Sequence, residues 1–493
     1  MPSLATTSAS QPAPWSVRQT ALFFAGLFAI LLASRLCHID ILWADEDYHQ
    51  AAALQVLHGK TLYRDLWYDK PPLNVAAYLL FGAAGGAVLR IASAVYALLV
   101  CASAFAFARR LWTEREGRIA AALAAFFLIF YFPAATITLE PDTLLILPHL
   151  WAVYFAWQKR FFAAGVIAGI AMLCNVKAVF VLAACAVLSL SGGVIALLCL
   201  AFGFTIPHAA GLAWLQWHGA LAGYMEQVWR WGFLYAGSAS GLGAALQSGA
   251  LKAGNWAAFH AVLVLAAAWC CWKDRERRVL WISWIALSFA SATVGWRFLP
   301  RYLDQLLPPL IIAASRGVAL VMIQKRRVLQ AILAVALLFP ALRFGPRYVI
   351  LASEIFRGSP HAWTDTAMDR DSRAASQIIS AIAPKDATLF VWGYRPNLFV
   401  YTKLTAASKF WDSQPLTGVP ADRHLSSDYT VAPDWAKANR EELVRSHPDF
   451  IADGLSLYNP RLNMRQYPDL AEWLAGYCEI ARTSGTVIYR RCR

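Results

Sequence analysis

Charged residues are scarce in this chain. Only 15% of its 493 residues are Asp, Glu, Lys or Arg, whereas 59% are hydrophobic. Soluble domains carry about 25% charged residues, so this composition excludes an ordinary soluble globular protein. Its repeated apolar runs match the roughly 17 to 25 residues that a helix needs to cross a bilayer. The sequence therefore predicts a mainly α, polytopic helical membrane protein.

Two further absences narrow the function. The chain lacks the G-x-x-x-x-G-K-[ST] loop of nucleotide-driven ATPases, which argues against a primary pump. The net charge is +14, but no soluble surface interleaves basic with aromatic residues, so we expect no nucleic-acid partner. The basic residues instead lie in short loops between apolar runs, at Arg109, Arg110, Arg115, Arg118, Lys159, Arg160, 273–278 and 325–327. Such loops face the cytoplasm under the positive-inside rule.

Cysteine is also sparse outside the apolar segments. Seven of the nine cysteines lie in or beside these segments, where cysteine behaves as a small hydrophobic residue. Cys478 and Cys492 differ, because they flank an alternating pattern with a turn near Gly485, which predicts a hairpin. A disulfide between them would form in an oxidising compartment. Two reduced thiols fit the sequence equally well.

The apolar runs predict about eleven membrane spans, and the shorter run 73–86 reads as an interfacial or partly re-entrant segment. The predicted spans are 19–38, 88–108, 117–134, 142–158, 161–175, 177–191, 193–213, 254–272, 279–296, 303–323 and 328–345. With the N-terminus in the cytoplasm, all the basic loops fall inside. Asp45, Lys70, Glu140, Arg297 and the C-terminal segment then fall outside. This predicts a multi-pass protein of the inner (plasma) membrane with a periplasmic C-terminal domain.

Composition divides the chain into three parts. Residues 1–17 are rich in Ser, Ala and Pro and predict a disordered tail. Residues 18–345 form the predicted transmembrane domain, and residues 346–493 have the composition of a small soluble α/β domain. No convincing signal-peptide cleavage site follows the first apolar run, so we read that run as a retained span.

Two regions outside the spans carry further structural signals. In the C-terminal part, 374–382 and 441–446 predict helices, whereas 388–392 and 450–452 predict strands. A long outer loop at 214–252 is rich in Trp and Tyr. Its aromatic side chains could lie on the lipid headgroups or wall a cleft for a long-chain lipid.

An acidic cluster follows the first predicted span, at Asp45, Glu46 and Asp47. Charge at a bilayer boundary is costly, so such a cluster suggests a site. A carboxylate there could act as a general base and take a proton from an acceptor hydroxyl. The neighbouring acid could orient the acceptor or hold a cation. Asp45 and Asp47 also match a D-x-D pattern, weak support for a divalent metal, and ordinary solvated acids remain the plain alternative.

A second acidic patch, Glu140-Pro-Asp142, opens the fourth predicted span on the same side of the membrane. Acids at a helix start are favoured by capping and by the helix dipole, which is the structural alternative for Asp142. Two acidic patches on one face are less readily explained by coincidence.

Basic residues on the predicted outer face are unexpected under the positive-inside rule, so each suggests a specific role. Lys70, Lys177, Arg297 and Arg301 lie next to span ends. They could bind phosphate or extend to the headgroups. We favour phosphate binding for Lys70, fixed by two prolines, and for Arg301, and headgroup contact for Lys177.

Taken together, these motifs resemble the integral-membrane GT-C glycosyltransferases, in particular the branch of protein O-mannosyltransferases and lipid A aminoarabinose transferases. The matching residues are Asp45-Glu46, Gly59 to Asp65 leading to Lys70-Pro71-Pro72, Leu139 to Asp142, Arg301-Tyr302 with Pro308, Trp392-Gly393 and Tyr401. The resemblance covers nearly the whole chain, and the first outer loop is its most specific part. Where that family often has a glutamate before the lysine, this chain has Asp69, which puts the role of that side chain in doubt.

The resemblance implies inverting transfer of a sugar from a polyprenyl-phosphate donor to a hydroxyl acceptor at the outer membrane face. Asp45 would be the general base, assisted by Glu46, and Lys70 would contact the donor phosphate. Glu140 or Asp142 would fill the second acidic position, and Arg297, Arg301 and Tyr302 would bind substrate. The family divides over metal dependence, so a divalent cofactor stays open.

Other functions remain compatible with parts of the sequence. A secondary transporter or lipid-linked glycan flippase would keep polar groups near the membrane midplane in paired repeats, whereas here the charges lie at the outer boundary. A glycan polymerase or ligase would share the donor and differ in acceptor. A non-catalytic scaffold would leave the acidic clusters unexplained. The sequence does not choose between a glycan, a lipid and a protein as the acceptor.

Overall fold

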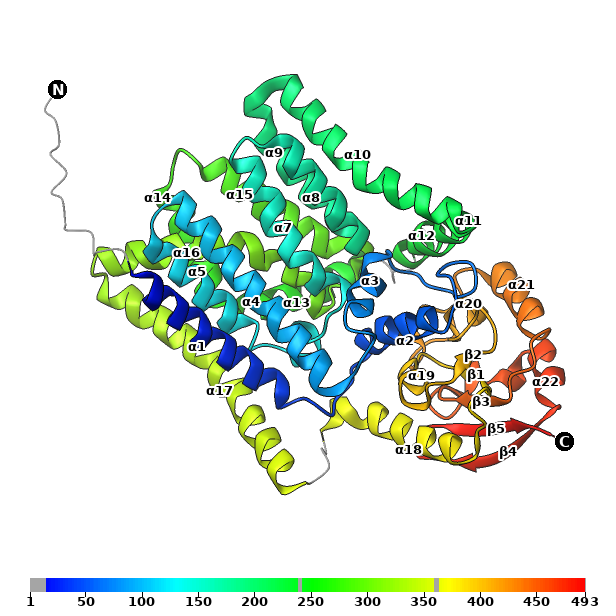
Figure 1. Ribbon diagram of the computed structural model, residues 1–493. Coiled ribbons are helices and arrows are strands. Elements are labelled where there is room, and N and C mark those ends of the chain that lie inside the picture. Colours follow the sequence, from blue (N-terminus) through cyan, green and yellow to red (C-terminus); the bar gives the residue numbers. More distant parts are fainter. Residues whose placement is uncertain (1–14, 238–241, 359–362, 493) are drawn as a thin grey trace, which may run out of the picture.

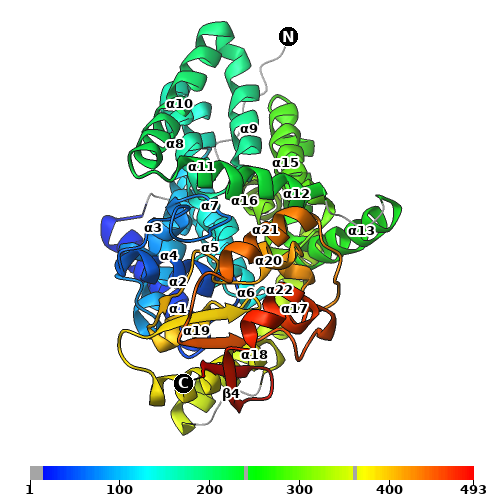
Figure 2. The same ribbon diagram turned by 90° about the vertical axis from the view of Figure 1, so that its right-hand side faces the viewer.

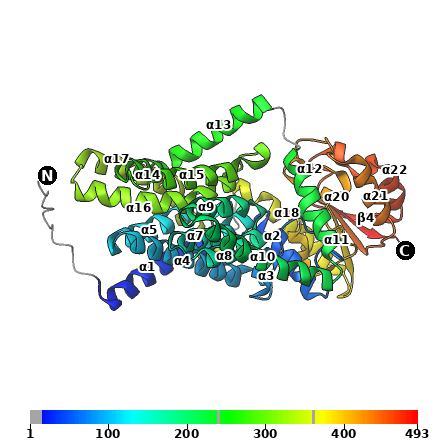
Figure 3. The same ribbon diagram turned by 90° about the horizontal axis from the view of Figure 1, so that it is seen from above.

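The computed structural model describes residues 15–237, 242–358 and 363–492. Figure 1 shows a bundle of long helices with a sheet-containing domain at one end and α2 and α3 between the two parts. The view from above in Figure 3 shows the same arrangement. Of the predicted tail, residues 1–14 lie outside the described part. Ser16 then caps the first helix by accepting a hydrogen bond from the Gln19 backbone N–H.

Helices account for nearly all of the first part of the chain. Their bounds are α1 Val17–Leu36, α2 Glu46–Leu57, α3 Leu73–Leu79, α4 Gly86–Leu111, α5 Glu114–Phe127, α6 Pro133–Thr136, α7 Pro141–Trp157, α8 Phe161–Cys174, η1 Val176–Ala178, α9 Val179–Ser189, η2 Leu190–Gly192, α10 Gly193–Trp217, α11 Leu221–Tyr224, η3 Met225–Arg230, α12 Trp231–Gly237, α13 Leu242–Phe259, α14 Ala261–Lys273, α15 Arg278–Thr293, η4 Val294–Trp296, η5 Pro300–Leu306, α16 Leu307–Ile323 and α17 Arg327–Arg357. The predicted polytopic helical architecture is confirmed.

Each predicted span overlaps one or more of these helices. Among the described residues, six stretches are long and apolar enough to cross a membrane, or seven if the bent pair α13–α14 is one span. The number of spans therefore stays a prediction. Segment 73–86 contains only the short helix α3, and the outer loop after α10 is largely helical.

Small residues allow the bundle helices to pack closely. A Cβ atom on Gly165 of α8 would lie 2.1 Å from the Leu200 carbonyl oxygen of α10, and one on Gly317 of α16 would lie 1.8 Å from that of Ala266 in α14. Only glycine fits at these contacts, as is common where membrane helices pack against each other.

The C-terminal domain is a mixed α/β domain, as predicted, with its sheet in front in Figure 2. Its elements are η6 Thr364–Thr366, α18 Ala367–Ile382, β1 Thr388–Trp392, α19 Asn397–Thr402, β2 Thr405–Ala406, α20 Gln414–Thr417, η7 Ala421–Arg423, α21 Pro433–Leu443, β3 Phe450–Asp453, η8 Pro460–Leu462, η9 Met464–Gln466, α22 Pro468–Leu474, β4 Tyr477–Arg482 and β5 Val487–Arg491. The strand order is β2-β1-β3-β5-β4. β1 runs parallel to β2 and β3, and β5 runs antiparallel to β3 and β4. The helix predicted at 441–446 begins earlier, at Pro433.

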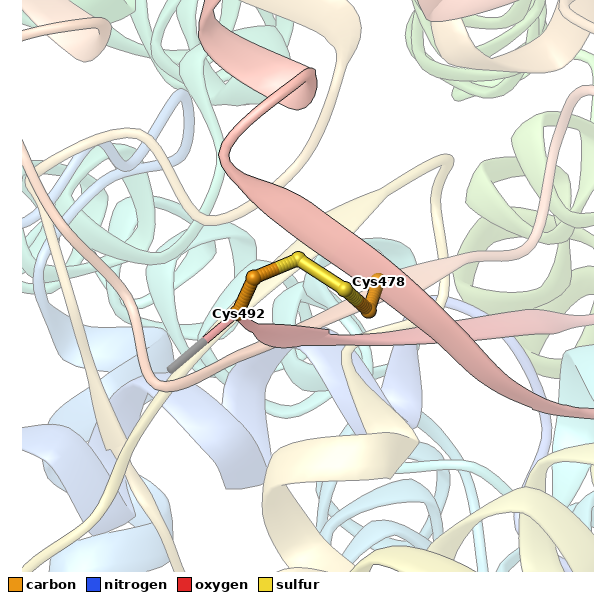
Figure 4. Close-up of a disulfide and its surroundings, with 2 residues drawn as sticks. All are labelled: Cys478 and Cys492. Atoms are coloured by element: carbon orange, nitrogen blue, oxygen red, sulfur yellow. A yellow bond between two sulfur atoms is a disulfide. The ribbon is translucent and has the colours of Figure 1, made fainter.

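The β4–β5 hairpin is closed by a disulfide between Cys478 and Cys492, with Cα atoms 5.4 Å apart (Figure 4). The structure thus selects the disulfide from the two alternatives that the sequence left open.

One hydrophobic cluster joins the two parts of the chain. Tyr48 of α2, Trp67 of the first outer loop, Trp231 of α12 and Trp411 of the C-terminal domain are all buried in it. The predicted boundary after residue 345 falls inside α17, which continues to Arg357. The C-terminal domain is therefore packed onto the membrane-proximal loops.

Candidate active site

A cavity of about 420 Å³ lies between one end of the helix bundle and the C-terminal domain. Six of the predicted site residues line it: Asp45, Lys70, Glu140, Asp142, Arg301 and Tyr302. They come from four separate segments of the chain. The structure brings them to one place.

Asp45 immediately precedes α2, with φ +73° and ψ −46°. Positive φ is unusual for a residue other than glycine. The Asp45 carboxylate forms an ion pair with the guanidinium of Arg301 in η5. The proposed base therefore lies in direct contact with one of the proposed phosphate-binding cations.

Lys70 reaches the cavity from the first outer loop. Its ammonium group is 2.9 Å from the Asp69 carboxylate, and its backbone carbonyl accepts a hydrogen bond from the Tyr63 hydroxyl at 2.8 Å. Burial lowers the pKa of Lys70, but the Asp69 charge outweighs this and raises it overall. Lys70 is thus held in its charged form, and Asp69 lies where it can orient that charge.

A second ion pair crosses the cavity between Asp142 and Lys177, at 3.0 Å. The Asp142 carboxylate also accepts a hydrogen bond from the Asn175 side-chain amide at 3.0 Å. The Lys177 ammonium lies 2.9 Å from the centre of the Tyr302 ring, a cation–π contact. Lys177, which we expected to extend to the headgroups, therefore belongs to the cavity.

Glu140 lies beside this pair and caps α7 by accepting the Thr143 backbone N–H at 3.3 Å. Burial, with Asp142 and Asp45 nearby, raises the pKa of Glu140 to about 8, although Arg301 opposes the shift. Glu140 is thus a carboxyl group that can carry a proton at neutral pH. It both caps α7 and lines the cavity.

Glu46 does not line the cavity, which differs from its predicted role as a catalytic residue. Its carboxylate makes two hydrogen bonds to Arg90 of α4, at 3.0 and 2.8 Å, and both side chains are buried. Asp45 precedes α2 with a non-helical backbone and lines the cavity. Glu46 is the first residue of α2, and its side chain lies against α4 of the bundle.

Arg297 is also absent from the lining, which differs from its predicted role in substrate binding. It forms an ion pair with Asp422 of the C-terminal domain and stacks on the ring of Tyr235, 3.8 Å from the ring centre. Asp422 and Tyr235 themselves line the cavity. Arg297 therefore fixes two wall residues and joins the two parts of the chain.

The residues do not form a recognisable metal centre. Of the two acids of the D-x-D pattern, Asp45 lines the cavity, whereas Asp47 is buried and does not line it. Burial, with the charges of Asp45 and Asp369, raises the pKa of Asp47. Across the described ranges, no group of three or more His, Cys, Asp or Glu side chains could hold a metal ion.

The C-terminal domain supplies lining residues that sequence reasoning did not find. They are Met368, Tyr394, Gln414, Ala421, Asp422, His424, Leu425, Gly454 and Leu455. They lie more than 60 residues beyond Arg301, and no motif links them to it. Asn175 was also missed, although a polar residue between two apolar spans was a usable signal.

Comparisons with known proteins bear on the fold of this chain. Residues 73–194 match the family model described as dolichyl-phosphate-mannose-protein mannosyltransferase. ArnT from Cupriavidus metallidurans bound to undecaprenyl phosphate has a similar structure, with a TM-score of 0.58, 13% identity, and coverage of 96% of this chain and 98% of that chain. This chain has the GT-C fold. The apo form of that ArnT gives a TM-score of 0.55 at 14% identity, with 96% and 97% of the two chains covered.

A more distant similarity has the same GT-C architecture. The apo oligosaccharyltransferase of Archaeoglobus fulgidus gives a TM-score of 0.50 at 13% identity, with 97% of this chain and 75% of that chain covered. A comparison with curated proteins finds no match. The fold and the family match support a membrane glycosyltransferase and give no support to the transporter alternative.

Proposed function

We propose that this protein is an inverting glycosyltransferase that moves a sugar from a polyprenyl-phosphate donor to a hydroxyl acceptor at the outer membrane face. The main support is the single cavity in which Asp45 lies with the cations Lys70, Lys177 and Arg301. A base and a group of cations are what transfer from a lipid phosphate requires.

An apolar groove beside the cavity suits the lipid chain of such a donor. It has a volume of about 270 Å³ and is lined by Leu73, Ala77, Tyr96, Leu144, Leu147, Pro148, Trp151, Ile167, Ile170 and Cys174. Pro71 and Asn175 line the cavity, and each lies within two residues of a groove residue. The donor phosphate would then lie near Lys70 while its chain follows the groove.

In the proposed reaction, Asp45 takes the proton from the acceptor hydroxyl as its oxygen attacks the anomeric carbon of the sugar. The new carbon–oxygen bond forms as the bond to the phosphate oxygen breaks, and the electron pair leaves with the polyprenyl phosphate. Lys70 and Arg301 stabilise the charge that develops on the phosphate. A lipid phosphate is already a good leaving group, so no strong general acid is needed.

The charge distribution supports a location in the plasma membrane. With the N-terminus in the cytoplasm and the basic loops inside, the cavity and the C-terminal domain face the periplasm or its equivalent. The Cys478–Cys492 disulfide is in keeping with an oxidising compartment. The acceptor is a hydroxyl of a glycan, lipid or protein, and the donor sugar is a hexose or a pentose.

The direct test is to incubate the purified protein in lipid with polyprenyl-phosphate sugars and measure released polyprenyl phosphate. The wild-type protein should release it in the presence of a suitable envelope fraction as acceptor. Asp45→Asn should lower the rate at least about 100-fold while the protein still inserts and folds. Near-normal turnover by that variant would exclude Asp45 as the base, and donor crossing the bilayer without phosphate release would indicate a flippase.

A further inference from the structure

The segment that carries Lys70 is bound along its length by one stretch of the C-terminal domain, residues 409–414. The Trp67 backbone N–H donates to the Lys409 carbonyl at 2.7 Å. The Trp411 indole N–H donates back to the Trp67 carbonyl at 2.5 Å. The side-chain amide of Gln414 donates to the carboxylate of Asp69, which lies two residues after Trp67, at 3.4 Å. These contacts fix the backbone of the lysine loop and the side chain that holds the lysine.

Gln414 is itself held in place. Its side-chain oxygen accepts the Ala421 backbone N–H at 2.9 Å, and its own backbone N–H donates to Asp412 at 2.8 Å. It is 2% exposed and lines the cavity. The Asp69 oxygen that accepts from Gln414 is the one that pairs with the Lys70 ammonium. A fixed amide of the C-terminal domain therefore meets the partner of Lys70 directly.

Aromatic packing makes the same connection rigid. The ring of Tyr48 stacks on Trp411 with centres 5.0 Å apart, and its hydroxyl accepts the Asp69 backbone N–H at 3.3 Å. On another side of the loop, Gln227 of η3 accepts the Tyr68 backbone N–H at 2.8 Å. Tyr48 and Gln227 therefore hold the backbone N–H groups of residues 68 and 69, and the C-terminal stretch holds Trp67 and the Asp69 carboxylate.

From these contacts we propose that Trp411 and Gln414 are positioning residues for the donor, acting from the C-terminal domain through Asp69 to aim Lys70 at the donor phosphate. The inference rests on the function proposed above. A lysine ammonium binds phosphate as a point charge, so its location sets the strength of the interaction. Loss of either contact weakens donor recognition and leaves acceptor recognition intact.

The test compares three substitutions in the full-length protein. Trp411→Phe keeps an aromatic ring on Tyr48 and removes the indole donor, and Gln414→Leu removes the amide. Trp392→Phe is the matched control, because its indole N–H donates to the Leu462 carbonyl at 2.8 Å wholly inside the C-terminal domain. The donor KM, the acceptor KM, the affinity for undecaprenyl phosphate and the Tm are measured for each.

Trp411→Phe and Gln414→Leu should each raise the donor KM and weaken undecaprenyl phosphate binding about fivefold, the usual size of one lost hydrogen bond. The acceptor KM and the Trp392→Phe values should not change. In a Lys70→Met background the two substitutions should have no further effect on donor binding, because they act through Lys70. A purely structural role would lower the Tm and persist in that background.

The results distinguish failure of this positioning role from failure of the proposed function. Wild-type donor binding in both variants, or equal losses in the Lys70→Met background, would overturn the proposal while the transfer reaction still stands. A wild-type protein that releases no polyprenyl phosphate from any donor would count against the proposed function itself.

Discussion

The carboxylate of Asp45 and the guanidinium of Arg301 form an ion pair inside the cavity, joining the start of α2 to η5. The pair couples two groups that would need different partners during transfer. Asp45 would have to face the acceptor hydroxyl, and Arg301 the donor phosphate. We therefore expect the donor phosphate to compete with Asp45 for Arg301 and to free the base when it binds.

This competition predicts that Asp45→Asn binds undecaprenyl phosphate more tightly than the wild-type protein, although it transfers sugar much more slowly. Removing the carboxylate leaves Arg301 available to the phosphate, and we expect a gain of about tenfold, or about 1.4 kcal/mol. Isothermal titration in detergent or nanodiscs measures it. Asp422→Asn is the control, because Asp422 lines the same cavity and pairs with Arg297 instead of Arg301. An equal gain in both variants would point to general charge repulsion.

Glu46 should matter for stability and little for chemistry. Glu46→Ala leaves the buried Arg90 guanidinium without its charge partner, which costs about 3 to 5 kcal/mol. The variant should unfold at a markedly lower temperature in a thermal-shift measurement. Where folded protein is recovered, as with the milder Glu46→Gln, the transfer rate per folded molecule should stay near that of the wild type. A selective loss of rate at unchanged Tm would restore a catalytic role.

Asp412 predicts a pH-dependent stability. Burial, with Asp69 nearby, raises the pKa of Asp412 to about 8, although Lys70 opposes the shift. The folded state thus binds a proton that the unfolded state releases near its ordinary pKa of about 4. The bound proton therefore contributes to the free energy of unfolding at low pH. This contribution is lost as the pH rises from about 4 to about 8, by up to roughly 1 kcal/mol per pH unit. Asp412→Asn should show a flatter curve of Tm against pH, and identical curves would contradict the assignment.

The disulfide should stabilise the end of the sheet. It closes a hairpin with a sequence separation of 14, for which chain entropy gives about 3 kcal/mol. The double variant Cys478→Ser/Cys492→Ser should therefore be more sensitive to heat and to proteases in the C-terminal domain. Cys271→Ser, a change at one of the free cysteines, is the control. Equal protease resistance with and without the pair would show that the hairpin is held by packing alone.

Local patterns predicted much of the fold. Residues 388–392 form β1 with the expected bounds, and the hairpin around Gly485 is present. Apolar runs identified the helices of the bundle because each run carries its own signal along the chain. The boundary after residue 345 did not coincide with a helix end, because α17 remains helical after its composition becomes more polar.

The candidate site was predicted only in part. Asp45, Lys70 and Arg301 carried a signal because charge at a bilayer boundary is conspicuous in an apolar chain. Glu46 had the same signal, and only its buried contact with Arg90 separates it from Asp45. Gln414 had no signal, since a polar residue in a soluble domain is unremarkable until its neighbours are known.

The sequence by itself determined the membrane-embedded helical architecture and the chemical groups at its outer boundary, because hydropathy and charge are properties of each segment. Only the tertiary structure decided which of these groups share the cavity. That choice depends on side-chain direction within each helix and on contacts between residues hundreds of positions apart, such as Gln414 with Asp69. Neither the side-chain direction nor the long-range contacts can be predicted from a single segment of the sequence.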